Sequence, residues 1–181
     1  DLVNYRNDPD CFITIHLPLQ IIDDRIKSRM ICPKCGTSRN LQTLVTTDVR
    51  WDEEDQKFVL YCDNPKCEPT KMVAKEGDEK GIEPIRGRIN DDLALMMRAN
   101  DLYGIPKIAL YNSVEASLAS ELFDDYEITP EFVFDREGDK VTVGTKPYQP
   151  VENGVEFASL MPAPVVIQLI RQLVNTFIPQ E

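Results

Sequence analysis

The sequence contains no long apolar run. Its most apolar stretch, residues 165–178, is interrupted by two glutamines, an arginine and an asparagine. A membrane-spanning helix needs about 20 predominantly apolar residues, so no such helix is expected. The N-terminus also lacks the basic and then apolar segments of a secretory signal. We therefore expect no membrane partner and a location in the reducing cytoplasm or within a viral particle. No initiator methionine precedes Asp1, so we expect a chain that is trimmed, processed or cut from something longer.

The chain is also poor in the groups that enzymes use. His16 is its single histidine, so general-base chemistry would depend on carboxylates. The Gly-x-Ser-x-Gly nucleophile motif, the phosphate-binding loop, the dinucleotide fingerprint and the His-Glu-x2-His metal motif are all missing. We therefore predict a non-catalytic protein, although carboxylates that meet only in the fold keep catalysis open.

Positive charge is scarce overall but locally enriched. The 181 residues include 20 Lys+Arg and 31 Asp+Glu, for a net charge of −11. Residues 25–75 hold ten basic and seven acidic side chains, for +3, whereas residues 101–181 hold five and thirteen, for −8. Phosphate contacts dominate non-specific binding to nucleic acid, so the acidic half is a poor nucleic-acid surface. It is better suited to a basic protein partner, and only the segment 25–75 leaves a nucleic-acid contact open.

Four of the five cysteines form two close pairs. Two residues separate Cys32 from Cys35, and four separate Cys62 from Cys67. Zn²⁺ prefers four such thiolates in a tetrahedron, and a shell of four leaves no open position for water or substrate. Two disulfides or four free thiols are the alternatives, which the pair spacing and the missing secretory signal disfavour. The sequence therefore predicts a structural zinc site.

The segment between the pairs indicates a zinc ribbon. Residues 44–51 and 57–61 are rich in β-forming side chains, and the polar run 52–56 between them predicts a hairpin turn. The second strand leads directly into Cys62. A hairpin between two cysteine loops is the architecture of a ribbon, which we place at residues 30–75.

The residues around the cysteines form a pattern known from other ribbons: Cys32, Pro33, Cys35 and Gly36, followed by Cys62, Asn64, Pro65 and Cys67. This pattern resembles the ribbons of the Ogr/Delta family of phage late-gene activators and the four-cysteine module of NAD-dependent DNA ligases. The resemblance covers about residues 30–70, and the spacer is longer than in the ligases. Those families use the ribbon on DNA, so the resemblance implies a local ribbon fold and a possible DNA contact. The candidate nucleic-acid-binding residues are Arg50, Trp51, Lys66 and Lys71.

The rest of the chain predicts an α+β or α/β body. Residues 1–29 and 76–181 form this compact mixed body, into which the ribbon is inserted. Asn90 is the expected N-cap of one helix, and Asn112 with Ser113 caps the next. The expected elements are a short helix or turn at 21–30, helices 91–103, 114–123 and 165–178, strands 11–17, 107–111, 131–135 and 140–143, an extended segment at 84–89 and a loop at 147–154.

Alternation along the first strand predicts which of its residues are buried. One face carries Cys11, Ile13, Ile15 and Leu17, and the other carries His16. We therefore expect Cys11 to be a small core residue, and His16 to be a packed or surface residue. In the helix at 91–103, the adjacent Met96 and Met97 favour core filling, with a promiscuous binding groove as the alternative.

The C-terminal helix at 165–178 has more apolar surface than one buried face needs. Positions 166, 169, 170, 173, 174 and 177 follow helical spacing, and 168, 171, 172 and 175 form the polar face. Val165, Ile167 and Ile178 widen the apolar stripe. The helix is therefore either deeply buried in this chain or docked on another subunit. In the second case, the candidate partner-binding residues are Ile167, Ile170, Val174 and Phe177.

Two function classes follow from these observations. The first is a non-catalytic assembly or adaptor subunit of a larger complex, such as a viral (phage) structural or assembly component, which binds other protein subunits through the C-terminal helix. The second is a nucleic-acid-binding transcription regulator or accessory factor that uses the ribbon. The acidic balance, the closed metal shell and the wide apolar stripe favour the first class.

Overall fold

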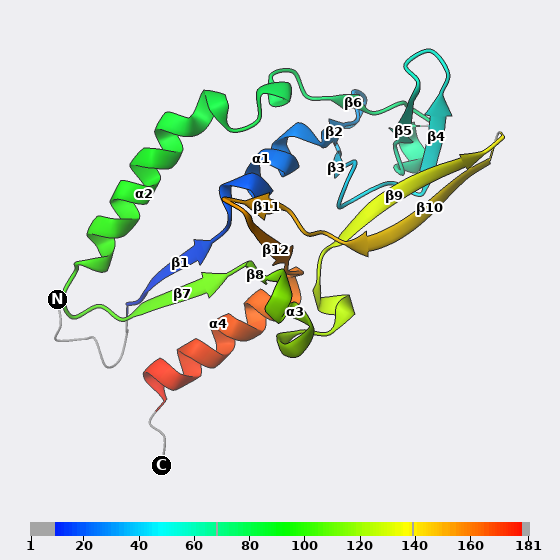
Figure 1. Ribbon diagram of the computed structural model, residues 1–181. Helices are drawn as coiled ribbons and strands as arrows, with labels where there is room; N and C mark the ends of the chain where they lie inside the picture. The colour runs from blue at the N-terminus through cyan, green and yellow to red at the C-terminus, as the bar shows by residue number, and fades with distance from the viewer. Residues whose placement is uncertain (1–9, 68, 139, 179–181) are drawn as a thin grey trace.

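The computed structural model describes residues 10–67, 69–138 and 140–178 (Figure 1). Within them the chain is a mixed α+β body, as the sequence predicts, with four α-helices and twelve strands. The strands form five sheets of two or three strands each instead of one large sheet. Buried side chains accordingly gather in separate clusters, one within the cysteine module and another around Ala158.

The strands predicted at the N-terminus and in the middle of the chain are confirmed, and they pair in parallel. They are β1 (Phe12–His16) and β7 (Lys107–Tyr111). Helix α4 (Pro162–Phe177) runs along the outer edge of β7 (Figure 1). The N–H of Tyr111 donates to the side-chain oxygen of Gln168 at 3.2 Å, and Gln172 donates to the carbonyl of Ala109 at 2.8 Å. Amide side chains of α4 therefore close this edge of the sheet.

The face of β1 that was expected to join the core is largely open. Ile13 and Ile15 are 40% and 56% exposed, whereas their register partners on β7, Ile108 and Leu110, are buried. Helix α4 packs on β7 rather than on β1, which explains the difference. Cys11 lies beside this open face and is half-buried, so the prediction that it is a core residue is wrong.

Helix α2 (Arg86–Asn100) begins before the predicted cap at Asn90. A 3-10 turn at Glu83–Ile85 leads straight into it, with Pro84 in the turn and Arg86 ion-paired to Glu83 at 2.5 Å. Proline fixes φ near the helical value, so the helical conformation starts here. The extended segment predicted at 84–89 is therefore wrong.

The predicted cap at Asn112-Ser113 is also wrong, because Ser113 starts a strand. A short helix, α3 (Ala116–Leu122), follows. It packs around the buried Ala158 on β12 (Val155–Ser159), the middle strand of a three-stranded sheet. This sheet takes residues from the predicted loop 147–154 and from a strand that the sequence did not indicate. The other strands of the sheet are β8 (Ser113–Glu115) and β11 (Val151–Glu152).

The cysteine module consists of two small sheets. The predicted hairpin is confirmed, although its first strand begins later than expected, at Asp48. The module has its own buried cluster, formed by Cys32, Leu60, Cys62, Cys67 and Met72. Its strands are β2 (Arg29–Ile31), β3 (Ser38–Asn40) and β6 (Val73–Ala74) in one sheet, and β4 (Asp48–Asp52) and β5 (Lys57–Tyr61) in the other.

A second hairpin from the C-terminal half holds the cysteine module. It consists of β9 (Pro130–Glu137) and β10 (Lys140–Pro147), which confirm and extend the predicted hairpin. The rings of Phe134 and Phe58 lie 5.3 Å apart. Arg136 forms an ion pair with Glu53 at 2.5 Å. The module is thus inserted in the sequence but is packed against a segment more than 70 residues away.

The segment that follows the module is anchored to helix α1 (Leu19–Lys27). Asp23 of α1 accepts the N–H of Ile82 at 2.9 Å and pairs with Lys27 at 2.6 Å. Gly81 passes this carboxylate with φ +56°, and a Cβ placed on it would lie 1.9 Å from the Asp23 Oδ1 atom. Only glycine fits this contact without moving α1 or the segment.

We expect Gly81→Ala to lower the free energy of unfolding by about 2–4 kcal/mol, because it adds a steric conflict to an unfavourable φ. Urea titration followed by circular dichroism measures the change. The control is Gly77→Ala, where φ is also positive (+88°) but no atom lies within 4 Å of the added Cβ. The control should cost about 1–2 kcal/mol from backbone strain alone. Equal losses in the two variants would contradict the close contact at Asp23.

Candidate metal centre

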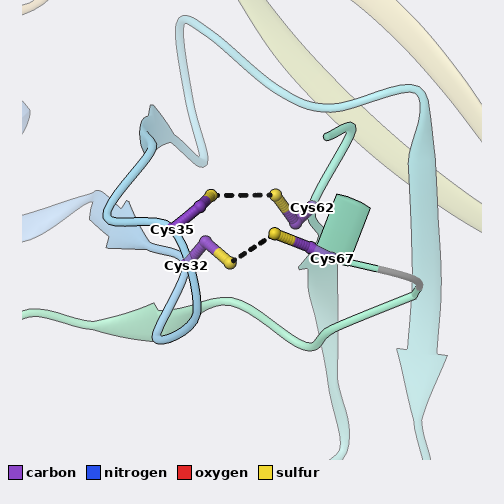
Figure 2. Close-up of side chains that lie close together, drawn as sticks. All are labelled: Cys32, Cys35, Cys62 and Cys67. Atoms are coloured by element: carbon purple, nitrogen blue, oxygen red, sulfur yellow. Dashed lines mark hydrogen bonds between the residues drawn. The ribbon is translucent and has the colours of Figure 1, made fainter. Parts of the chain in front are cut away.

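The two predicted cysteine pairs converge on one point (Figure 2). The Sγ atoms of Cys32 and Cys67 are 4.0 Å apart, and those of Cys35 and Cys62 are 3.7 Å apart. All four sulfur atoms lie within 4.8 Å of one another. These distances exclude disulfides, and the four cysteines could hold a metal ion.

Local backbone structure aims the first pair. Cys32 follows directly after β2, and the chain turns back so that the N–H of Gly36 donates to its carbonyl at 2.9 Å. Gly36 has φ +72°, which side chains rarely tolerate, so glycine suits this loop. The N–H of Cys32 donates to the carbonyl of Thr37 at 3.0 Å, which closes the turn. Both sulfur atoms of the pair therefore leave one tight loop toward the same point.

The second pair is held by a longer loop. Cys62 directly follows β5, and Cys67 lies in a 3-10 turn at Pro65–Cys67. The carbonyl of Asn64 accepts the N–H of Cys67 at 2.9 Å, while its side chain accepts the N–H of Lys66 at 3.0 Å. The side chain and the backbone of Asn64 therefore both fold the loop back toward the first pair.

The sulfur geometry fits a tetrahedral thiolate site. Around Zn²⁺ with Zn–S distances of about 2.3 Å, neighbouring sulfur atoms lie about 3.8 Å apart. The two Sγ–Sγ separations given above, 3.7 and 4.0 Å, bracket this value. Cys32, Cys62 and Cys67 are buried and Cys35 is exposed, so an ion would be reached from one side only. The donor set is four soft sulfur ligands, which favours zinc over magnesium or calcium.

The surroundings act differently on the individual thiols. The hydroxyl of Thr37 lies 3.1 Å from the Cys35 sulfur and lowers the pKa of Cys35 to about 6. Burial and the neighbouring thiols raise the pKa of Cys67 to about 12. A bound cation deprotonates such ligands. Of these two thiols, the exposed Cys35 therefore supplies a thiolate to an incoming ion more readily.

Three of the four candidate nucleic-acid-binding residues are engaged within the chain. Arg50 forms hydrogen bonds with Asp48 at 2.8 and 2.6 Å and lies 4.1 Å from the Tyr61 ring centroid. Lys71 is ion-paired with Asp52 and, at 3.3 Å, with Asp55.

The remaining two candidates differ from each other. Trp51 packs edge-on against Phe58 at 5.0 Å and beneath the Arg136 guanidinium at 5.3 Å, whereas Lys66 is exposed. Arg50 and Trp51 line one hollow of about 380 Å³, which Lys66 and Lys71 do not line. Arg136 was not predicted as part of this region, since 83 residues separate it from its partner Glu53. No local pattern in the sequence indicates such a pair.

The orientation of α4 departs in part from the expected amphipathic pattern, since Leu169 and Leu173 are half-buried and Arg171 is exposed as expected. Gln168 and Gln172, assigned to the polar face, point to the β7 edge. Ile167, Ile170 and Val174 are 41%, 54% and 39% exposed. Phe177, the fourth candidate partner-binding residue, is half-buried. Most of the predicted partner-binding residues therefore lie on an uncovered side of the helix.

Other residues singled out by sequence lie apart from the cysteine cluster. His16 is exposed, stacks on Tyr111 at 5.1 Å and is 3.0 Å from the Thr14 hydroxyl, as expected for a surface residue. Met97 is 71% exposed, so the core-filling prediction for the two methionines is wrong for this one. Met96 is half-buried and lines a shallow hollow beside β1.

Comparison with known proteins gives no match to a family model, a curated protein or a solved structure. The site must therefore be interpreted from its own geometry. Among the described helices, none is both long enough and apolar enough to cross a membrane.

We expect the purified protein to bind about one equivalent of zinc. Cys35→Ser should remove most of this affinity, because three thiolates and a hydroxyl bind zinc more weakly than four thiolates. Metal analysis after gel filtration measures the stoichiometry, and Cys11→Ser is the matched control, since Cys11 lies outside the cluster. A strong chelator should unfold the ribbon first, because metal binding and folding are coupled at such sites. Protein prepared without chelator that contains no zinc would contradict this prediction.

Proposed function

We propose that this protein is a non-catalytic subunit of a larger protein assembly. A structural zinc ion holds its ribbon, and the uncovered side of α4 docks on another protein. The observation that carries the proposal is the exposure of Ile167, Ile170 and Val174 on a helix whose glutamines face inward. Exposing large apolar side chains to water is unfavourable, and a partner surface that covers them removes this cost.

Zinc has a structural role in this proposal. Four thiolates complete a tetrahedral shell, so no ligand position is left for water or substrate. When bound, the ion supplies cross-linking between the two cysteine loops. The ribbon's buried cluster contains three of the four cysteines, so a cluster this small depends on that cross-link.

The total exposed surface supports docking on a partner. A compact monomer of 20.7 kDa exposes about 8,900 Å², whereas this chain exposes 12,400 Å². If about 160 Å² is deducted for each of the fourteen residues outside the described part, the remaining surplus is about 1,300 Å². A standard protein–protein interface buries about 800 Å² on each partner. The surplus is thus large enough for one such interface.

The charge of α4 is also suited to a protein partner. Within a chain of net charge −11, this helix carries one charged residue, Arg171. Charged residues are depleted at the centre of protein interfaces, and aliphatic side chains gain about 1.5–3 kcal/mol each on full burial. An apolar helix side that is free of acidic residues can therefore approach a partner without charge repulsion.

We expect Ile170→Glu to weaken association with the native complex at least tenfold while the chain stays folded and keeps its zinc. The exposed side chain tolerates a charge in the free protein, but a glutamate buried at an interface pays a desolvation cost. Size-exclusion chromatography with light scattering, on tagged protein isolated from its source, measures the assembly. Thr176→Glu, an exposed position on the same helix outside the apolar stripe, is the matched control.

Two results would overturn the assembly proposal. If Ile170→Glu unfolds the body, the side chain belongs to a core and not to a docking surface. If the wild-type chain is a folded monomer that binds duplex DNA tightly at physiological salt, the ribbon's role is nucleic-acid binding. In that case Arg50→Glu should weaken DNA binding and reduce its salt dependence, whereas Ile170→Glu should leave it intact.

A further inference from the structure

The outer edge of β1 has backbone groups without partners. The N–H of Phe12 donates to the carbonyl of Pro106 at 2.8 Å, and the carbonyl of His16 accepts the N–H of Asn112 at 3.1 Å. These bonds show that alternate residues of β1, starting with Phe12, direct their backbone groups toward β7. In such a ladder, the intervening residues Ile13 and Ile15 direct their N–H and C=O groups away from β7. Within the part of the chain that the structure describes, no residue pairs with these groups.

The two edges of this sheet are therefore treated differently. On β7, the glutamines of α4 bond the outward N–H and C=O of Tyr111 and the outward C=O of Ala109. The corresponding groups on β1 face no such side chains among the described residues. Proteins usually cover or charge an exposed edge, because unpaired strands recruit other chains. β1 instead carries no charged residue from Phe12 to His16, and presents half-exposed isoleucines.

Apolar side chains of one helix bound the space beside this edge. Helix α2 stands apart from β1 along much of its length (Figure 1), and the two share a hollow of about 220 Å³. The hollow is lined by Ile15, Leu17, Ile22, Ile89, Leu93 and Met96, among others. It is smaller than the 300–1,000 Å³ typical of small-molecule sites, so it suits an inserted side chain.

Helix α2 itself lacks the packing that would stabilise it. None of its fifteen residues is buried, and Leu95 and Met97 are largely exposed. Isolated helices of about 12–15 residues are only marginally stable in water. An additional chain between α2 and β1 would supply both main-chain partners for the edge and apolar contacts for the helix.

We propose that the groove between β1 and α2 binds an extended, uncharged apolar peptide segment of a partner protein by strand addition. The main chain of the peptide pairs with Ile13 and Ile15, and its alternate side chains enter the hollow. Among the residues that line the hollow, Asp92 is the one acidic side chain, and it lies 3.8 Å from Arg88. The groove therefore favours neutral side chains. This inference goes beyond the proposed function, because it concerns a surface separate from the docking side of α4.

The occupant follows from the edge chemistry and the available area. Donors and acceptors at strand spacing match an extended main chain, which a helix or a small apolar molecule does not present. The surplus exposed surface of about 1,300 Å² exceeds the approximately 800 Å² of one docking surface on α4 by about 500 Å², which is left for this second contact.

Peptide selection on the full-length, zinc-loaded chain tests the proposal. The probe is a random library of eight-residue peptides, and the readout is hydrogen exchange at Ile13 and Ile15. We expect enriched peptides to have apolar residues at alternate positions and no proline, and to slow exchange at these two amides at least tenfold. The same peptides with every amide N-methylated should not bind. If no peptide is enriched, or if enriched peptides leave both exchange rates unchanged, the proposal is wrong.

Ile15→Lys should weaken peptide binding at least tenfold, because it places a charge beside the hollow and on the strand edge. Val151→Lys is the matched control, since Val151 is 55% exposed on β11 and Ile15 is 56% exposed on β1. Circular dichroism and zinc content establish that both variants fold. Ile15→Pro is a second variant, because it removes an outward N–H that β7 does not use. Unchanged peptide binding in the folded Lys variant would overturn the proposal.

Hydrogen exchange of the free chain distinguishes the other possible occupants. Fast exchange at Ile13 and Ile15 in the free chain is expected. Slow exchange that depends on protein concentration, together with a doubled mass, would assign the edge to a second copy of this chain. Slow exchange independent of concentration would assign it to another part of the same chain. Either form of slow exchange would overturn the peptide proposal, whereas the result for Ile170→Glu on α4 would not change.

Discussion

The structure depends on the closure of two short loops around four cysteine sulfur atoms. Without this closure, the hairpin β4–β5 has no fixed position relative to β2 and β3, since the module's own buried cluster is largely made of those cysteines. The hairpin in turn forms the surface on which β9 and β10 pack, through Phe58, Phe134, Glu53 and Arg136. A bound ion contributes a large share of the stability of such a module, because few apolar side chains are available to stabilise it instead.

The local parts of this arrangement could be predicted from sequence, and the distant parts could not. Each cysteine loop lies within six residues, with Gly36 in the first and Asn64 in the second, so local spacing predicted both loops and the four converging ligands. The start of α2 was missed because Asn90 is a good cap by itself, whereas Pro84 and the Glu83–Arg86 ion pair start the helix earlier. β8 and β12 were missed since their pairing joins Val114 to Ala158, and neither segment has a strong strand pattern of its own.

The many small sheets have an energetic consequence. A single large sheet covered by helices buries one continuous core, whereas five small sheets divide the apolar residues among clusters that each cover little area. Helices at the periphery of such a body are packed on one side only, or hardly at all in the case of α2. The large exposed surface is thus a direct result of the topology.

Helix α4 shows why amphipathic pattern alone assigns the wrong side to the core. The pattern placed Gln168 and Gln172 toward solvent, yet these residues satisfy the Tyr111 and Ala109 backbone groups at the β7 edge. An unpaired edge amide or carbonyl costs about 1–3 kcal/mol when it is shielded from water, so two well-placed glutamines can outweigh the burial of an isoleucine. The polar requirement of the sheet edge therefore sets the rotation of the helix. Ile167, Ile170 and Val174 are left exposed as a consequence, whereas Leu169 and Leu173 stay half-buried beside the glutamines.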